Sequence, residues 1–219
     1  MKKIFFDSST IISIAMTCAL GPVFKLQKDF GNFAITPTVK SETIDKALRT
    51  LKFKYEGFRL MSLLHSGKLK LYPEKNLSSK IYQVEELMNK TFFAKGKALT
   101  IMHPGEVSAL IVAKEQNADA YAVDERTTRL LVESPKKVAE LMSSKLHTSV
   151  NIDKNNLRDL KKQIKDVPII RSTELALAAY KKGYFGKKNK ELLEGVLWAL
   201  KFNGCAISKK EIKSYTKIS

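Results

Sequence analysis

Residues 103–129, HPGEVSALIVAKEQNADAYAVDERTTR, constrain the fold more than any other stretch of the chain. Pro104 suits the first position of a helix, and apolar residues at helical spacing follow it. The short apolar run 120–123 then indicates a buried strand that ends at Asp124. A helix that leads directly into a buried strand is typical of an α/β domain with a parallel sheet.

The chain begins with a similar unit, because the predicted strand 3–6, which is apolar after Lys3, ends at Asp7 and a helical pattern follows. Helical patterns alternate with three more short runs that predict strands, at residues 33–35, 69–72 and 167–170. The sequence therefore predicts an α/β fold with a central parallel sheet. We expect one domain over residues 1–219, in which the charged segment 133–166 is a helical insertion before the last strand.

The formal net charge is +17, from 39 Lys and Arg against 22 Asp and Glu. Such a surface attracts polyanions, so nucleic acid is the expected partner class; the alternative is a Lys-rich solvated surface. Two cysteines provide neither a disulfide framework nor a zinc site of the usual spacing. No apolar run reaches the length of a signal or membrane segment, so we expect a soluble cytoplasmic protein that does not contact a membrane.

Four acidic residues fall at the boundaries of the predicted elements. Asp7 and Asp124 follow strands, whereas Glu42 and Glu106 lie in early helical turns. In a parallel sheet all four can converge above the carboxyl edge, where open α/β sheets bind ligands. Clustered carboxylates repel one another unless a cation neutralises them, and all-oxygen ligation suits Mg²⁺ or Mn²⁺. The three histidines lack the spacing of zinc ligands.

Each acid also has an ordinary structural interpretation. Asp7 can cap the helix after it, Asp124 is expected to cap a helix over residues 125–131, and Glu42 can pair with Lys46 on a helix surface. A carboxylate-bound cation would instead favour phosphodiester hydrolysis, because it activates a bound water for attack on phosphorus. The sequence contains no Walker loop or GxGxxG turn and suggests no serine or cysteine hydrolase arrangement.

Two basic stretches are candidates for phosphate contacts. Residues 46–75 contain eight Lys or Arg and two Glu, with Phe53, Tyr55 and Phe58 interleaved, and aromatic rings can stack on unpaired bases. The alternative for this stretch is an amphipathic helical hairpin with a solvated outer face. The other candidate nucleic-acid contacts are Lys187, Lys188, Lys190 and Arg126.

The strings FFDSSTII, SET (residues 41–43), PGEVSALIVA and AVDERTTR, in that order, resemble the PIN-domain nucleases, especially the compact prokaryotic VapC-like proteins. The resemblance covers residues 1–132 and 167–208; the roughly thirty residues between the DER helix and the last strand depart from it, since such connections are usually short. It implies a three-layer α/β/α domain that cleaves single-stranded RNA with bound Mg²⁺ or Mn²⁺, and it implies a homodimer and an antitoxin-like protein partner.

The same resemblance implies roles for particular residues. The catalytic and metal-binding acids would be Asp7, Glu42, Glu106 and Asp124. Ser9 matches a small polar residue that supports the metal, and Ser172-Thr173 resembles a supporting turn after the last strand. Glu125 is close enough in sequence to share the role of Asp124.

Two other functions fit parts of the same sequence. A non-catalytic RNA-binding protein of PIN fold would keep the basic surface without using the acids. The string DSST also resembles the first half of a haloacid-dehalogenase phosphatase signature, with Asp7 as a phosphorylated nucleophile. That signature has a second aspartate two positions later, where this chain has Ser9.

Overall fold

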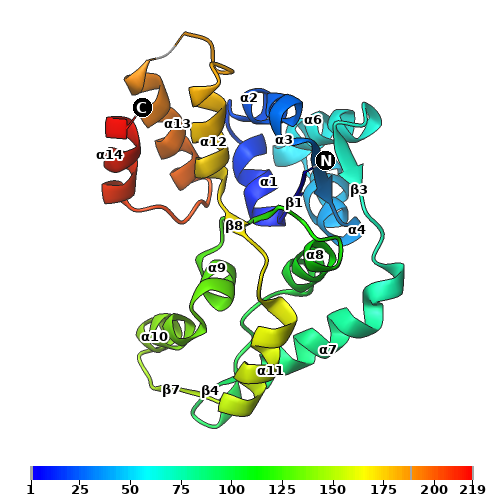
Figure 1. Cartoon of the computed structure of the whole chain (residues 1–219), viewed down its shortest axis with the longest axis vertical. Helices are drawn as coiled ribbons and strands as arrows, with labels where there is room; N and C mark the ends of the chain where they lie inside the picture. The colour runs from blue at the N-terminus through cyan, green and yellow to red at the C-terminus, as the bar shows by residue number, and fades with distance from the viewer. Residues whose placement is uncertain (1, 188, 219) are drawn as a thin grey trace.

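The computed structural model describes residues 2–187 and 189–218, and its centre is a five-stranded parallel sheet (Figure 1). The strand order is β3-β2-β1-β6-β8. The strands are β1 (Lys3–Phe6), β2 (Asn32–Ile35), β3 (Leu69–Leu71), β6 (Ala120–Ala122) and β8 (Ile169–Ile170). The predicted α/β fold with a central parallel sheet is therefore confirmed.

The direction in which the strands are added reverses at β1. The chain passes from β1 outward through β2 to β3, and it then crosses to the other side of β1 for β6 and β8. Asp7 N donates to Ala122 O at 2.9 Å, which extends the pairing of β1 with β6 by one residue. Open α/β sheets bind ligands at such a reversal, outside the carboxyl ends of the strands. Asp7 and Asp124 lie at this point because Asp7 directly follows β1 and Asp124 lies two residues beyond the end of β6.

Helices cover both faces of the sheet and give a three-layer α/β/α arrangement (Figure 1). The helices around the sheet are α1 (Ser8–Ala15), α2 (Leu20–Lys25), α3 (Gln27–Phe30), α4 (Pro37–Lys40), α5 (Lys46–Leu48), α6 (Lys54–His65), α8 (Pro104–Glu115), α9 (Arg126–Glu133), α12 (Ser172–Lys181), α13 (Lys190–Phe202) and α14 (Lys209–Ile218). The shorter helical turns are η1 (Ser41–Asp45), η2 (Leu51–Phe53) and η3 (Lys75–Leu77).

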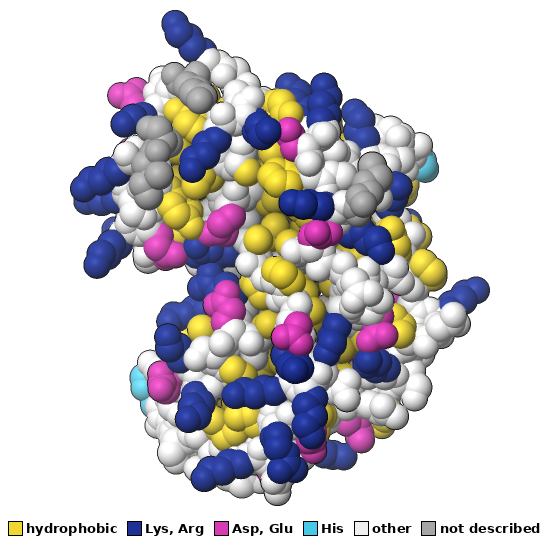
Figure 2. Space-filling view, in the orientation of Figure 1, with side chains coloured by type: hydrophobic (Ala, Val, Ile, Leu, Met, Phe, Trp, Pro, Cys, Tyr) yellow, Lys and Arg dark blue, Asp and Glu magenta, His cyan; other side chains and the backbone are white. Residues whose placement is uncertain are grey.

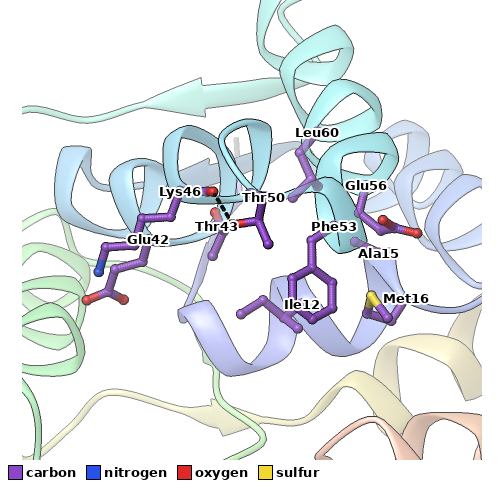
Figure 3. Close-up of a pocket in the computed structure, with 11 residues that line it drawn as sticks. Ile12, Ala15, Met16, Glu42, Thr43, Lys46, Thr50, Phe53, Glu56 and Leu60 are labelled. Atoms are coloured by element: carbon purple, nitrogen blue, oxygen red, sulfur yellow. Dashed lines mark hydrogen bonds between the residues drawn. The ribbon is translucent and has the colours of Figure 1, made fainter.

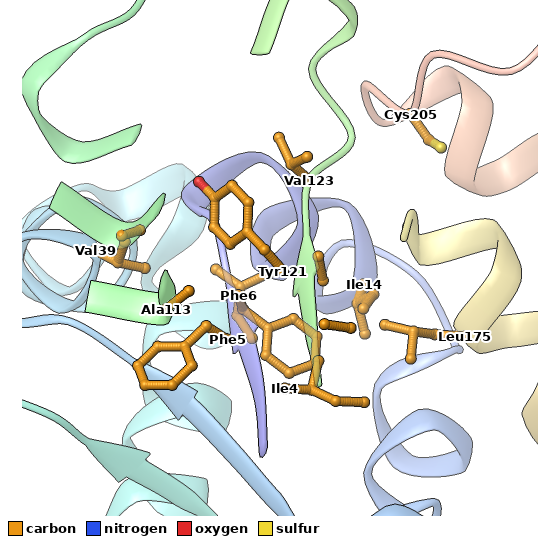
Figure 4. Close-up of a cluster of buried hydrophobic side chains, with 14 of the residues drawn as sticks. Ile4, Phe5, Phe6, Ile14, Val39, Ala113, Tyr121, Val123, Leu175 and Cys205 are labelled. Atoms are coloured by element: carbon orange, nitrogen blue, oxygen red, sulfur yellow. The ribbon is translucent and has the colours of Figure 1, made fainter. Parts of the chain in front are cut away.

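The central strands β1, β2 and β6 are mainly apolar, and nearly all of their residues are buried, as expected for parallel strands that are covered on both faces. Figure 4 shows Ala113 of α8 on one side of β1 and Leu175 of α12 on the other. Along β1, the Phe5 ring meets Tyr72 at 5.1 Å and the Phe6 ring meets Phe33 at 5.1 Å. Removing any of these rings would leave a cavity in a packed core, which lowers stability.

A second, smaller lobe is built from two segments that lie apart in sequence (Figure 1). Its elements are α7 (Ser78–Asn89), β4 (Phe92–Ala94), β5 (Lys97–Ala98), α10 (Pro135–Leu146), β7 (Val150–Ile152) and α11 (Lys154–Ile164). Strand β4 pairs with both β5 and β7 in antiparallel fashion. The segment 133–166, expected to be helical, contains the helices α10 and α11, but it also contains β7, which pairs with β4 and so joins the segment to the chain before α8.

The helix after β6 begins one residue later than expected. Glu125, not Asp124, is the N-cap of α9, and its side chain accepts a hydrogen bond from Thr128 N at 2.8 Å. The prediction that Asp124 caps this helix is therefore wrong. Asp124 is free of the capping role because its side chain faces the start of α12 instead.

None of the helices in the described part of the chain is by itself long and apolar enough to cross a membrane. One bent pair, Ser8–Ala15 with Leu20–Phe30, passes the same test by length and composition.

The C-terminal helices are tied to the sheet by one buried cation, Arg171, which is 7% exposed. Its guanidinium donates to Glu174 Oε1 at 2.5 Å and to Glu211 Oε1 at 2.9 Å. Tyr215 donates to the same Glu174 oxygen at 2.5 Å. Although burial opposes it, hydrogen bonds from Ser208 and Arg171 lower the pKa of Glu211 to about 2. The network therefore connects the strand β8 end to α14.

Replacing Arg171 by Met is expected to lower the free energy of unfolding by about 2–3 kcal/mol. The loss is below that of a fully enclosed pair because the Glu174 and Glu211 side chains are 33% and 42% exposed. Urea denaturation measures the change. Lys182→Met is the matched control, since its ion pair with Asp29 is on the surface and its loss should change stability little. Equal losses of stability in the two variants would mean that the buried Arg171 network contributes no more than a surface ion pair.

Candidate active site

Asp7 and Asp124 are the most deeply buried acids at the carboxyl edge, and each is 1% exposed. Asp7 Oδ2 accepts hydrogen bonds from Ser9 N at 2.9 Å and from Ser9 Oγ at 2.5 Å. Asp124 Oδ1 accepts from Ser172 N, at the start of α12, at 2.7 Å. The remaining oxygens, Asp7 Oδ1 and Asp124 Oδ2, are buried without a hydrogen-bond partner among the described residues. A buried carboxylate oxygen without a partner is costly, so each is an open position for a donor or a cation.

Ser9 connects these two acids. Its hydroxyl donates to Asp7 Oδ2 and accepts from Asp124 N at 3.1 Å. The position arises because Asp7 is the N-cap of α1, which turns the first residues of the helix back over the strand end. The capping interpretation of Asp7 is therefore confirmed, and it uses only one of the two carboxylate oxygens.

Glu42 lies in the π-helical turn η1, between α4 and α5. The sequence predicted a regular helix here, and the wider turn is a departure of a kind that is frequent at functional sites. Glu42 Oε2 accepts from Ser8 Oγ at 2.5 Å. The ion pair with Lys46 is not found in the described part of the chain, so Glu42 faces α1.

The start of α8 lies directly against Glu42. A Cβ added to Gly105 would come within 2.7 Å of Glu42 Oε1 and 2.9 Å of Glu42 Oε2. No real Cβ tolerates such a distance, so only glycine permits this approach. Gly105 therefore allows the Glu42 carboxylate to lie directly against the residue that precedes Glu106 in the sequence.

Replacing Gly105 by Ala is expected to lower the rate of any reaction that depends on Glu42 by about 10- to 100-fold, because a shift of about 1 Å in a reacting group costs that much. Stability should change little, since the displaced atoms are the flexible end of Glu42. The reaction rate and the melting temperature are measured together. Gly195→Ala in α13 is the control, because its added Cβ would meet no atom within 4 Å outside its chain neighbours and the backbone of its own helix, among the described residues. An undiminished rate in the Gly105 variant would exclude a role for the position of Glu42.

Glu106 occupies the first turn of α8, as predicted from Pro104 at the helix start. Its Oε2 accepts from His103 N at 2.8 Å, and its Oε1 accepts from Thr128 Oγ1 of α9 at 2.6 Å. Burial raises the pKa of Glu106 to about 7, and the charge of Asp7 adds to this, whereas the hydrogen bonds from Thr128 and His103 oppose it. Glu106 can therefore gain or lose a proton near neutral pH.

The electrostatics of the other acids centre on Asp7. Burial raises the pKa of Asp7 against the hydrogen bonds from Ser9, and the charge of Glu42 raises it further. Burial also raises the pKa of Asp124. Burial and the charge of Asp124 together raise the pKa of the neighbouring Cys205 to about 12. Negative charge is thus unfavourable throughout this region without a cation.

The carboxyl edge offers two carboxylate oxygens without a hydrogen-bond partner among the described residues, together with further carboxylates and hydroxyls. Oxygen donors of this kind are the type that Mg²⁺ and Mn²⁺ prefer, whereas zinc favours nitrogen and sulfur. The described residues contain no group of three or more His, Cys, Asp or Glu side chains already arranged to hold a metal ion. Hydroxyl groups hold two of the acids, since Ser8 donates to Glu42 and Thr128 donates to Glu106. The charge of Glu42 raises the pKa of Asp7, and the charge of Asp7 raises the pKa of Glu106. Ser9 connects Asp124 to Asp7, because its hydroxyl accepts from the Asp124 backbone N and donates to the Asp7 carboxylate.

Sequence reasoning missed three polar side chains of this site. Tyr121 is fully buried on β6, and its hydroxyl donates to Glu106 O at 3.4 Å. Burial and the charges of Asp7 and Glu106 raise its pKa well above the usual value. A tyrosine in an otherwise small apolar strand, three residues before Asp124, was the available signal. Ser8 and Thr128 gave no signal, because their partners lie 34 and 22 residues away.

The predicted supporting residues Ser172, Thr173 and Glu125 have different contacts in the structure. Ser172 orients Asp124 through its backbone, and Thr173 Oγ1 lies 3.9 Å from Cys205 Sγ. Glu125 is occupied by its capping bond, so the structure does not pair it with Asp124.

The predicted nucleic-acid contacts do not form one patch. Arg126 is exposed at the start of α9, two residues after Asp124. Lys187 and Lys190 are exposed near the turn between α12 and α13, at the end of the molecule opposite the smaller lobe (Figure 1). Lys188 lies outside the described residues. Figure 2 shows Lys and Arg side chains spread over both the main body and the smaller lobe.

No protein-family model, curated protein or solved structure matches this chain.

Proposed function

We propose that this protein is a metal-dependent endoribonuclease that hydrolyses single-stranded RNA. The observation that carries the proposal is the pair of buried, partnerless oxygens of Asp7 and Asp124 at the reversal of strand order, with Glu42 and Glu106 beside them. The capping role of Asp7 and the contact of Asp124 with Ser172 each use one carboxylate oxygen, which leaves the other without a hydrogen-bond partner among the described residues.

Mg²⁺ or Mn²⁺ is the proposed cofactor, held by Asp7, Asp124, Glu42 and Glu106, with Ser9 in support. When bound, it would supply activation of a water molecule and neutralisation of phosphate charge. The protein's own contribution is orientation: Ser9 fixes Asp7 and Ser172 fixes Asp124. Without a cation the pKa of Glu106 is about 7, so a metal that binds this carboxylate would displace its proton near neutral pH.

The substrate class follows from charge. A net charge of +17 favours a polyanion, and exposed aromatic side chains between the lysines of residues 46–75 favour unpaired bases. A cytoplasmic location, a homodimer and an antitoxin-like protein partner belong to the same proposal, and size-exclusion chromatography tests the dimer directly.

The test is incubation with end-labelled single-stranded RNA in Mn²⁺ or Mg²⁺, with and without EDTA. Cleavage in metal that EDTA abolishes is expected. A double-stranded RNA of the same sequence is the matched control and should resist. Binding without cleavage under either metal would overturn the proposal.

That last outcome is the result expected of a second candidate, a non-catalytic RNA-binding protein. Its support is that hydroxyls already engage Glu42 and Glu106, and that the described residues show no ready-made metal group. A phosphatase with Asp7 as nucleophile is a third candidate. It would form a covalent aspartyl-phosphate and act on phosphomonoesters, which mass spectrometry and a monoester assay detect.

A further inference from the structure

A pocket of about 240 Å³ adjoins the acids on the side of Glu42 (Figure 3). It lies between α1, η1, η2 and α6, and Glu42 is part of its wall. The apolar side chains that face it are Ile12, Met16, Phe53 and Leu60. We propose that this pocket binds one unpaired base of the RNA strand, next to the nucleotide at the acids; this rests on the proposed function in taking RNA as the substrate.

The size and the walls of the pocket suit a flat heterocycle. Its volume is below the about 300–1,000 Å³ of sites for drug-sized ligands, so it has room for a single ring system. In Figure 3 the Phe53 ring projects into the space toward Ile12, which is 41% exposed although it is apolar. An aromatic face opposite an aliphatic side chain is an arrangement on which any base can stack.

The polar groups of the pocket lie at its ends. Glu42 and Lys46 lie at one end in Figure 3, and Glu56 lies at the other. The amino and imino groups of a base can donate to Glu56, whereas Lys46 is placed at the end nearest the acids, where a phosphate would pass. The pocket and the acid site therefore share Glu42, and one strand can occupy both.

The surface around the pocket has the charge that an RNA strand requires. Residues 46–59 contain five Lys or Arg and one Glu. Lys52 Nζ lies 5.1 Å from the Phe53 ring centroid, so a base that stacks there also meets a cation. The side chains of Tyr55 and Phe58, which both lie on α6, are 70% and 57% exposed. An apolar polypeptide segment would not be favoured by this density of positive charge.

The test uses short single-stranded RNAs that carry 2-aminopurine, whose fluorescence falls when it stacks. Titrations are made in EDTA, so that no cleavage is needed. Wild type is expected to quench the fluorescence at one position in the strand, and Phe53→Ala to lose this quenching and bind about tenfold more weakly. Phe53→Tyr should keep both. Tyr82→Ala is the control, because Tyr82 is an exposed tyrosine of α7 that does not line the pocket, and it should retain the quenching.

Ile12→Glu gives an independent variant, because its exposed position tolerates a charge and the new carboxylate repels RNA. It should also lose the quenching while melting like wild type. Quenching that is equal in wild type, Phe53→Ala and Ile12→Glu would overturn the pocket even if RNA is cleaved. Quenching that depends on Phe53 in a protein that never cleaves RNA would overturn only the nuclease.

Discussion

Replacing Asp7 or Asp124 by Asn is expected to reduce cleavage of single-stranded RNA by at least about a thousandfold, or about 4 kcal/mol in transition-state free energy. Each replacement removes the charge of an oxygen that is buried and has no partner among the described residues. The amide keeps the size of the carboxylate and an oxygen that can accept from Ser9 or Ser172. Single-turnover rates in saturating Mn²⁺ measure the loss.

RNA affinity separates this prediction from unfolding. Both variants should bind RNA as tightly as wild type or more tightly, because a carboxylate that repels phosphate has been removed. Asp45→Asn is the matched control, since Asp45 pairs with Lys40 on the surface only three residues from Glu42. It should cleave at the wild-type rate. Cleavage by Asp7→Asn within a few-fold of wild type would remove the acids from the mechanism.

The parallel sheet could be predicted because two of its strands have a clear pattern in the sequence. Buried parallel strands are continuous apolar runs, and residues 4–6 and 120–123 are both such runs that are followed by an aspartate. Since both aspartates follow strands of one parallel sheet, the sequence also predicted that they would share an edge. The structure places Asp7 and Asp124 there, joined through Ser9.

The smaller lobe could not be predicted in the same way. Strand β7 pairs with β4, whose register joins Phe92 to Ile152. The two strands lie far apart in the sequence, so their pairing leaves no periodic pattern within either segment. Strands of three residues are also too short to show an alternation of apolar and polar residues. The charged pattern of residues 133–166 therefore predicted helices alone.

The local backbone at Glu42 and the hydrogen-bond partners of the acids could likewise not be predicted from the sequence. The π-helical turn at Glu42 disturbs the helical period by only one residue, which an apolar pattern cannot resolve. The Thr128 hydroxyl reaches Glu106 from α9, so the partner of the acid belongs to another element. Spacing in sequence indicated which acids could meet, but not which hydroxyls would hold them.

Without divalent cations, the folded protein is expected to lose stability as the pH rises from about 4.5 to about 7. The pKa of Glu106 is near 4.5 in the unfolded chain and is raised to about 7 in the fold, mainly by burial. Between these values the folded state keeps a proton that the unfolded state has released, so the free energy of unfolding falls as pH rises. The shift corresponds to about 3 kcal/mol, and the raised pKa of Asp7 acts in the same direction.

Urea denaturation in EDTA at pH 5, 6, 7 and 8 measures this loss, with Glu106→Gln as the comparison. The amide is neutral at every pH, so the variant should lose far less stability over the window and should be the more stable protein at pH 8. Mn²⁺ should restore stability to wild type mainly above pH 7, where Glu106 is ionised and can act as a ligand. Parallel stability curves for the two proteins in EDTA would mean that Glu106 is not the titrating group. A cation effect that is the same at pH 5 and pH 8 would mean that the ion binds away from these acids.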